Sequence, residues 1–172
     1  MNRAIALAIA LALIAGVAMA QDQPEIPPEN DWRSGQTPPR PPVGDAAERA
    51  EQLFLAIQRD EPELARGFFF PQEPFRVLKG IADPDRYWNV LYRHYEDDIH
   101  ALHAELPEGA TFDRFVMTRR GGWVERRQEA NAIPYWASRH DWIYYRVGER
   151  EARVEVRTLI NWGPRWFITH LR

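Results

Sequence analysis

The sequence predicts an α+β domain in which N-terminal helices pack on a curved antiparallel sheet of about four strands. Three observations lead to this prediction. Apolar side chains recur at helical spacing through residues 45–106, whereas residues 111–171 alternate and are rich in β-branched and aromatic side chains. Short turns that contain glycine separate the later stretches, and helices followed by strands are typical of the α+β class.

The first predicted helix follows Asp45, which forms a capping-box pattern with Glu48. Its inner face is given by apolar residues three and four positions apart, namely Ala50, Leu53, Phe54 and Ile57. Two short helices are expected next, over residues 60–67 and 72–79, each closed by a glycine. Between them, the three phenylalanines 68–70 are too apolar to face solvent and should enter the core.

The longest predicted helix begins after Asp83, whose side chain can cap it, with Pro84 in the first turn. Pro107 and Gly109 end it. Its apolar stripe, expected to face the sheet, consists of Trp88, Leu91, Tyr95, Ile99, Leu102 and Leu106.

Strands are expected over residues 111–119, 134–147, 152–160 and 165–171. The dipeptides Gly148-Glu149 and Gly163-Pro164 mark the turns between the last three. Residues 121–131 are polar and are expected to form a loop, in which Trp123 has no evident role.

The closing hairpin carries a resemblance to a known family. A strand over residues 154–162, a turn at Gly163-Pro164 and a last strand bearing Trp166 follow the early helices. This order resembles the NTF2-like (cystatin-like) α+β roll superfamily over about residues 45–172, and the chain looks like an exported bacterial member. The resemblance implies helices that form a lid over a bent sheet. No family catalytic motif falls on these residues, and such rolls host enzymes, binders and association modules alike.

The N-terminus predicts export on a cleaved signal peptide, residues 1–20. Arg3 precedes an apolar run over residues 4–17, and Ala18-Met19-Ala20 provides the cleavage pattern. The competing interpretation is an uncleaved anchor, although the run is short for a bilayer span of about 20 residues. The mature protein is therefore expected in the periplasm or outside the cell, with no membrane span. Because the chain has no cysteine, its core must hold it without disulfides.

Residues 21–43 carry seven of the 14 prolines and are predicted to be a disordered linker that leads into one domain, residues 44–172. Trp32 is the only large apolar group of the linker. The domain has opposite charges in its halves, −7 over residues 44–108 and +5 over residues 109–172. This near-balance argues against nucleic acid as a partner.

A metal site is considered on the longest helix, where Glu96, His100 and His103 share one face. The same spacing suits a solvated acidic face with side-chain pairs along the helix. We favour that interpretation, and the sequence predicts neither a metal nor another cofactor.

The sheet provides the candidate ligand site. With two-residue or four-residue turns, Trp142 pairs with Glu155, and a row across three strands unites His140, Arg157 and His170. A change of one residue in either loop would break the row. On the same face the pattern places Trp136, Trp142 and Trp166, so an anion, an aromatic compound or a sugar would fit. The opposite face would pack under the long helix with Ile143, Val154, Val156, Ile160, Phe167 and Leu171. Alternatively, Arg157 pairs with a carboxylate and the tryptophans belong to the core.

Two functions follow as expectations. The first is a non-catalytic binding or interaction module of the cell envelope that uses the aromatic sheet face for a small ligand, an envelope protein or a homodimer. The second is a small roll-type hydrolase or isomerase that uses His140, Asp141 or His170. Asp141 alternates with His140, so both serve one site only across a bulge. No nucleophile or phosphate-loop motif is present, and no catalytic residue is assigned.

Overall fold

The structure, a computed structural model, describes residues 25–172. The predicted signal peptide, residues 1–20, and the start of the predicted linker lie outside the described residues. None of the helices in residues 25–172 has both the length and the apolar character that crossing a bilayer requires.

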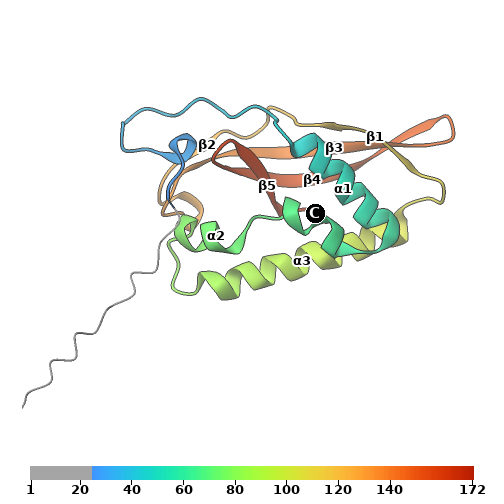
Figure 1. Ribbon diagram of the computed structural model, residues 1–172, viewed down its shortest axis with the longest axis horizontal. Coiled ribbons are helices and arrows are strands. Elements are labelled where there is room, and N and C mark those ends of the chain that lie inside the picture. The colour runs from blue at the N-terminus through green and yellow to red at the C-terminus, as the bar shows by residue number, and fades with distance from the viewer. Residues whose placement is uncertain (1–24) are drawn as a thin grey trace, which may run out of the picture.

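The predicted α+β class is confirmed. In the described residues, helices α1 (Ala46–Arg59), α2 (Gln72–Leu78) and α3 (Pro84–Glu105) pack against a curved, five-stranded antiparallel sheet (Figure 1). The strands are β1 (Thr111–Val116), β2 (Trp123–Val124), β3 (Tyr135–Val147), β4 (Arg150–Trp162) and β5 (Arg165–His170). Their spatial order is β1-β3-β4-β5, and β2 also pairs with β3. Short 3₁₀ turns occupy Pro28–Asn30, Pro62–Phe68 and Gln128–Ala130.

Helix α3 begins as predicted, because Asp83 accepts a hydrogen bond from the backbone N–H of Arg86 at 2.9 Å. Such a cap satisfies one of the free N–H groups at a helix start. The chain leaves the helix at Leu106, next to the predicted stop. The face toward the sheet buries Trp88, Leu91, Tyr92, Tyr95, Ile99 and Leu102.

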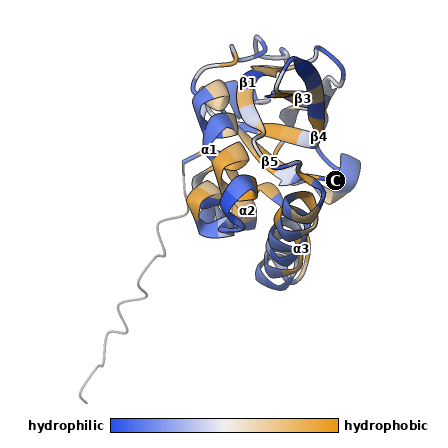
Figure 2. Ribbon diagram, turned by 90° about the vertical axis from the view of Figure 1, so that its right-hand side faces the viewer, coloured by the Kyte–Doolittle hydropathy of each residue, from blue (hydrophilic) through white to orange (hydrophobic). Residues whose placement is uncertain are grey.

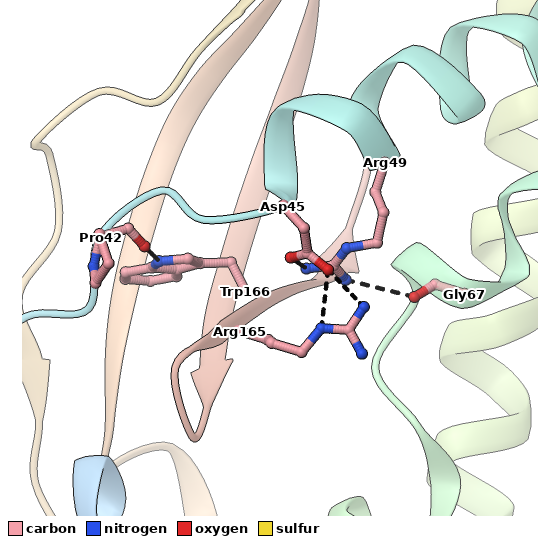
Figure 3. A network of polar contacts seen from close by, with 6 residues as sticks. All are labelled: Pro42, Asp45, Arg49, Gly67, Arg165 and Trp166. Atoms are coloured by element: carbon pink, nitrogen blue, oxygen red, sulfur yellow. Dashed lines mark hydrogen bonds and ion pairs between the residues drawn. The ribbon is translucent and has the colours of Figure 1, made fainter.

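Helix α1 begins without the predicted capping box, since Asp45 makes no side-chain cap. Its carboxylate instead accepts hydrogen bonds from Arg49 at 2.7 Å and from Arg165 of β5 at 2.6 Å. Figure 3 shows the two guanidinium groups on either side of this carboxylate, with Arg49 also reaching the carbonyl oxygen of Gly67. The acid therefore ties the start of α1 to the sheet.

The two closing turns have two-residue loops, one of the two lengths that the predicted register allowed. Gly148 and Gly163 have φ values of 59° and 61°, which suit the first central residue of a tight hairpin. Trp142 is consequently opposite Glu155, as predicted.

The last strand departs from the predicted register. Thr158, rather than Arg157, lies opposite His170, because Thr169 is an extra residue between this pair and the next one. His140 has a φ of 58°, a left-handed conformation that interrupts the regular strand. The three basic side chains therefore do not stand in the row that an uninterrupted register predicts.

The sheet face toward the helices holds the core. As predicted, it buries Ile143, Val154, Val156, Ile160, Phe167 and Leu171. The phenylalanines of residues 68–70 are also buried, and the ring of Phe70 packs on that of Phe167 at 5.5 Å between centroids. Figure 2 shows hydrophobic residues gathered where the helices meet the sheet. Each such side chain contributes about 1.5–3 kcal/mol when it is fully buried.

Residues 25–43, here called the arm, lie along the other face of the sheet, above it in Figure 1. This differs from the disordered linker that the prolines predicted. Asn30 is fully buried, donates to the carbonyl oxygen of Pro134 at 3.0 Å and accepts from the backbone N–H of Gly163 at 2.8 Å. Proline lacks a backbone N–H but keeps its carbonyl oxygen, and the carbonyl oxygens of Pro38 and Pro42 accept hydrogen bonds from indole N–H groups of the sheet.

The segment between β1 and β3, expected to be a loop over residues 121–131, contains the short strand β2. Trp123 packs against Trp136 with a centroid distance of 5.7 Å, which gives it a role. Gly121 has a φ of 97°, and a Cβ there would lie 2.5 Å from the carbonyl oxygen of Ala137. Only glycine fits at this crossing.

Candidate functional site

A cleft of about 320 Å³ lies between the helices and the inner face of the sheet, and is here called the helix–sheet cleft. One wall is apolar and includes Phe75 of α2, Leu91 of α3 and Ile160 of β4. The polar end is lined by Lys79, Glu129, Tyr135, Arg139, Thr158, Thr169 and His170. A concave site with apolar walls and a few convergent polar groups is the usual form of a small-ligand pocket.

Lys79 directly follows α2, and its side chain lines the polar end of the helix–sheet cleft. Its ammonium group donates to Asn131 Oδ1 at 2.7 Å and to the carbonyl oxygen of Glu129 at 3.1 Å. Burial lowers the pKa of Lys79, and the charge of Glu129 opposes this shift. The ammonium group is thus held in a fixed direction by the loop that precedes β3.

The carboxylate of Glu129 is held by two hydrogen bonds. Its carboxylate accepts from the Tyr135 hydroxyl and from the Arg139 guanidinium, both at 2.7 Å. Burial alone would raise the pKa of Glu129, but the Tyr135 hydrogen bond and the charges of Arg139 and Lys79 hold it below its usual value. Burial, together with Glu129, raises the pKa of Tyr135. At neutral pH this corner therefore contains an ionised carboxylate and a protonated phenol.

The loop that carries Glu129 is strained. Arg127, Glu129 and Ala130 have φ values of 71°, 50° and 57°, although none of them is glycine. Each such residue costs about 1–3 kcal/mol and persists only where the surroundings enforce it. The backbone N–H of Gly80 donates to the Ala130 carbonyl at 2.9 Å and so helps to hold the loop. Strain of this kind clusters at functional sites, which supports the cleft as the candidate.

His170 completes the polar end from β5. Burial lowers its pKa, and the positive charges of Arg157, Lys79 and Arg139 lower it further, while Glu129 acts in the opposite direction. Its imidazole is therefore neutral near pH 7, with Nδ1 at 3.1 Å from Thr169 Oγ1. Two cations and one carboxylate then leave the polar end with a net positive charge.

Two of the predicted site residues lie elsewhere, in a groove of about 450 Å³ beside β4 and the C-terminal end of α3. His140 and Arg157 line this groove together with Arg172. His140 is exposed and is paired with the carboxylate of Glu155. The structure thus brings His140 and Arg157 to one groove and places His170 in the helix–sheet cleft.

The predicted tryptophans do not surround either space. Trp136 and Trp166 lie under the arm, where their indole N–H groups donate to the carbonyl oxygens of Pro38 and Pro42. Trp142 is partly exposed and is covered by the guanidinium of Arg153, which lies 3.8 Å from the ring centroid. The aromatic face is therefore largely occupied by the chain itself.

Asp141 is fully buried and does not share a site with His140. Its Oδ1 accepts from the backbone N–H of Thr118 at 2.6 Å and lies 2.8 Å from the Ser138 hydroxyl. Its Oδ2 has no hydrogen-bond partner within the described residues. Burial raises the pKa of Asp141, although these hydrogen bonds and the charge of Arg40 oppose the rise.

The acidic face of α3 shows paired side chains. His100 is paired with Asp60, and His103 Nδ1 lies 2.9 Å from the carbonyl oxygen of Ile57. Across residues 25–172, no group of three or more His, Cys, Asp or Glu residues is arranged to hold a metal ion.

Lys79, Glu129, Tyr135 and Arg139 were not among the predicted site residues. One signal was present in the sequence, because Lys79 is the single lysine of a domain whose other basic side chains, histidine apart, are arginines. The position of Glu129 depends on a strained loop, which no local pattern indicates.

No protein-family model, curated protein or solved structure matches this chain. The function is therefore argued from the geometry of the helix–sheet cleft.

Proposed function

We propose that this protein is an exported, non-catalytic binding module of the NTF2-like roll type, and that its helix–sheet cleft binds a small anionic ligand. The observation that carries the proposal is the composition of the cleft, which joins an apolar wall to a positively charged end. The binding site thus moves from the aromatic sheet face, where the sequence placed it, to the face under the helices.

The ligand class follows from the two ends of the cleft. Lys79 and Arg139 outweigh Glu129 in charge, and the neutral His170 adds a polar group without adding charge. Phe75 and Leu91 offer only apolar contact. A carboxylate with a small apolar body satisfies both ends, and the volume of about 320 Å³ suits a molecule of that size.

Export and family membership rest on sequence and on element order. The signal-peptide pattern of residues 1–20 supports secretion. Early helices over the inner face of a curved antiparallel sheet support the NTF2-like roll. In such an arrangement the space between lid and sheet is a natural ligand site.

Calorimetric titration with benzoate and with its neutral isostere benzamide tests the proposal. We expect benzoate to bind and benzamide to bind at least tenfold more weakly, because a hydrogen bond to a charged group contributes about 1.5–3 kcal/mol. Lys79→Met keeps the side-chain stem and should reduce benzoate affinity about tenfold. Arg86→Gln, on the exposed surface of α3, is the matched control and should change nothing. Equal binding of the two compounds would refute an anion site.

A small hydrolase or isomerase is the second candidate, favoured by His170. A neutral imidazole beside a cleft is suited to act as a general base near pH 7. The test is turnover of simple activated esters by the wild-type protein and by His170→Asn. His94→Asn, at an exposed position of α3, is the control. Turnover that His170→Asn abolishes and His94→Asn retains would establish catalysis, and the absence of turnover above background would exclude ester hydrolysis.

A further inference from the structure

The arm contains an extended segment built around one arginine, Pro38-Pro39-Arg40-Pro41-Pro42. Each proline fixes φ near −65°, and a residue that precedes a proline favours an extended backbone. These constraints together produce a polyproline-II helix, which has no internal hydrogen bonds and exposes its carbonyl oxygens. The segment therefore has its conformation before it contacts the sheet.

Two tryptophans of the sheet donate hydrogen bonds to the first and last prolines of this segment. Trp136 Nε1 donates to the carbonyl oxygen of Pro38 at 3.0 Å, and Trp166 Nε1 donates to that of Pro42 at 2.8 Å. Figure 3 shows the second contact, with the indole of Trp166 directed at the Pro42 carbonyl. Pro41, between the two hydrogen-bonded prolines in the sequence, is buried. Aromatic side chains recur in sites that bind proline-rich segments.

The central arginine has its own site. The guanidinium of Arg40 lies 5.9 Å from the Trp136 ring centroid and 5.2 Å from the Trp166 ring centroid. It also donates to the carbonyl oxygen of Thr118 at 3.5 Å. The buried carboxylate of Asp141 lies within electrostatic reach, with one oxygen that has no partner in the described residues. Aromatic faces with a buried carboxylate form a favourable environment for a cation.

We propose that Trp136 and Trp166, together with the carbonyl oxygen of Thr118, form a recognition site for polyproline-II segments with an arginine between prolines. The arm occupies this site in cis, and a segment of the same chemistry on a separate polypeptide is its partner. This proposal is independent of the helix–sheet cleft, which lies on the opposite face of the sheet. Within the described residues, each hydrogen bond between residues 36–42 and the rest of the domain joins a side chain to a backbone carbonyl oxygen. No backbone–backbone hydrogen bond joins them. None of them requires that the segment belong to the same chain.

The arm then acts as a built-in competitor. Asn30 anchors it upstream, and Gly44 joins it to α1 downstream in a left-handed conformation, with a φ of 57°, that favours glycine. Tethering between these points gives the segment a high effective concentration at its site. A partner in trans therefore binds well only when the cis contact is weakened.

The test uses the full chain and a labelled synthetic peptide, Gln-Thr-Pro-Pro-Arg-Pro-Pro-Val, which copies residues 36–43. Fluorescence anisotropy measures its binding to the wild type and to Arg40→Glu, in which repulsion from Asp141 weakens the arm but leaves the site intact. We expect the peptide to bind Arg40→Glu at least tenfold more tightly than the wild type. A peptide with glutamate in place of arginine should bind neither protein. Equal affinities for the two proteins, or for the two peptides, would overturn the proposal.

Two further measurements keep the result unambiguous. Trp136→Phe, introduced together with Arg40→Glu, keeps the ring but removes the N–H donor and should weaken peptide binding several-fold, whereas Trp142→Phe should not. If Arg40→Glu does not fold by circular dichroism, Arg40→Gln replaces it with the same expectation. Light scattering is run in parallel. A wild-type dimer that Arg40→Glu dissociates would identify the occupant as the arm of a second copy and would overturn the separate partner.

Discussion

Replacing Asn30 by alanine tests whether the arm belongs to the folded domain. Asn30 is fully buried and bonds to the carbonyl oxygen of Pro134 and to the backbone N–H of Gly163. Asn30→Ala leaves these two groups without a partner, at a cost of about 1–3 kcal/mol each. We expect a loss of about 3 kcal/mol in the free energy of unfolding. If residues 21–43 were a disordered linker, Asn30→Ala would leave the free energy of unfolding unchanged.

Urea denaturation followed by circular dichroism measures this effect. With a slope of about 2 kcal/mol per molar urea, the midpoint should fall by about 1.5 M. Asn89→Ala, at an exposed position of α3, is the control and should leave the midpoint unchanged. A decrease of less than about 0.5 kcal/mol for Asn30→Ala, within the range of ordinary surface substitutions, would refute the docked arm.

Three further predictions concern stability. Gly121→Ala should destabilise the protein by at least about 2 kcal/mol in thermal unfolding, because its Cβ would lie 2.5 Å from the Ala137 carbonyl oxygen, and a wild-type melting temperature would contradict the packing described. Asp83→Ala should cost about 1 kcal/mol through loss of the α3 cap, measured by urea midpoints. Burial and nearby positive charges lower the pKa of His170, so the unfolded chain binds its proton more tightly. Its stabilising contribution is therefore complete above about pH 6.5 and is lost as the pH falls toward the lowered folded-state pKa. His170→Asn should flatten urea midpoints over this interval, and an unchanged slope would exclude the shift.

Local patterns predicted much of the fold. The cap at Asp83, the apolar stripe of α3 and the glycine turns each depend on residues within a few positions of one another. Such signals act before tertiary contacts form, so the helices, the hairpins and the inner face of the sheet could be derived from them.

The candidate site was less predictable for physical reasons. The left-handed conformations of His140 and Glu129 are imposed by tertiary contacts. The extra residue at Thr169 changes the strand register, and no glycine at that position indicates a bulge in the sequence. Proline content suggested a free linker because composition describes a segment alone. It does not reveal that Trp136 and Trp166 present donors to that segment.

The arm's anchor has a consequence for how the protein is made. Asn30 and Gly163 are 133 positions apart, so the arm is synthesised well before the hairpin that receives it. Contacts of such long range form slowly, because closure of the intervening chain precedes any gain. The arm therefore reaches its docked position only after the hairpin of β4 and β5 has formed. Docking of the arm then requires the hairpin formed by β4 and β5, and a chain that lacks this hairpin leaves Asn30 without its Gly163 partner.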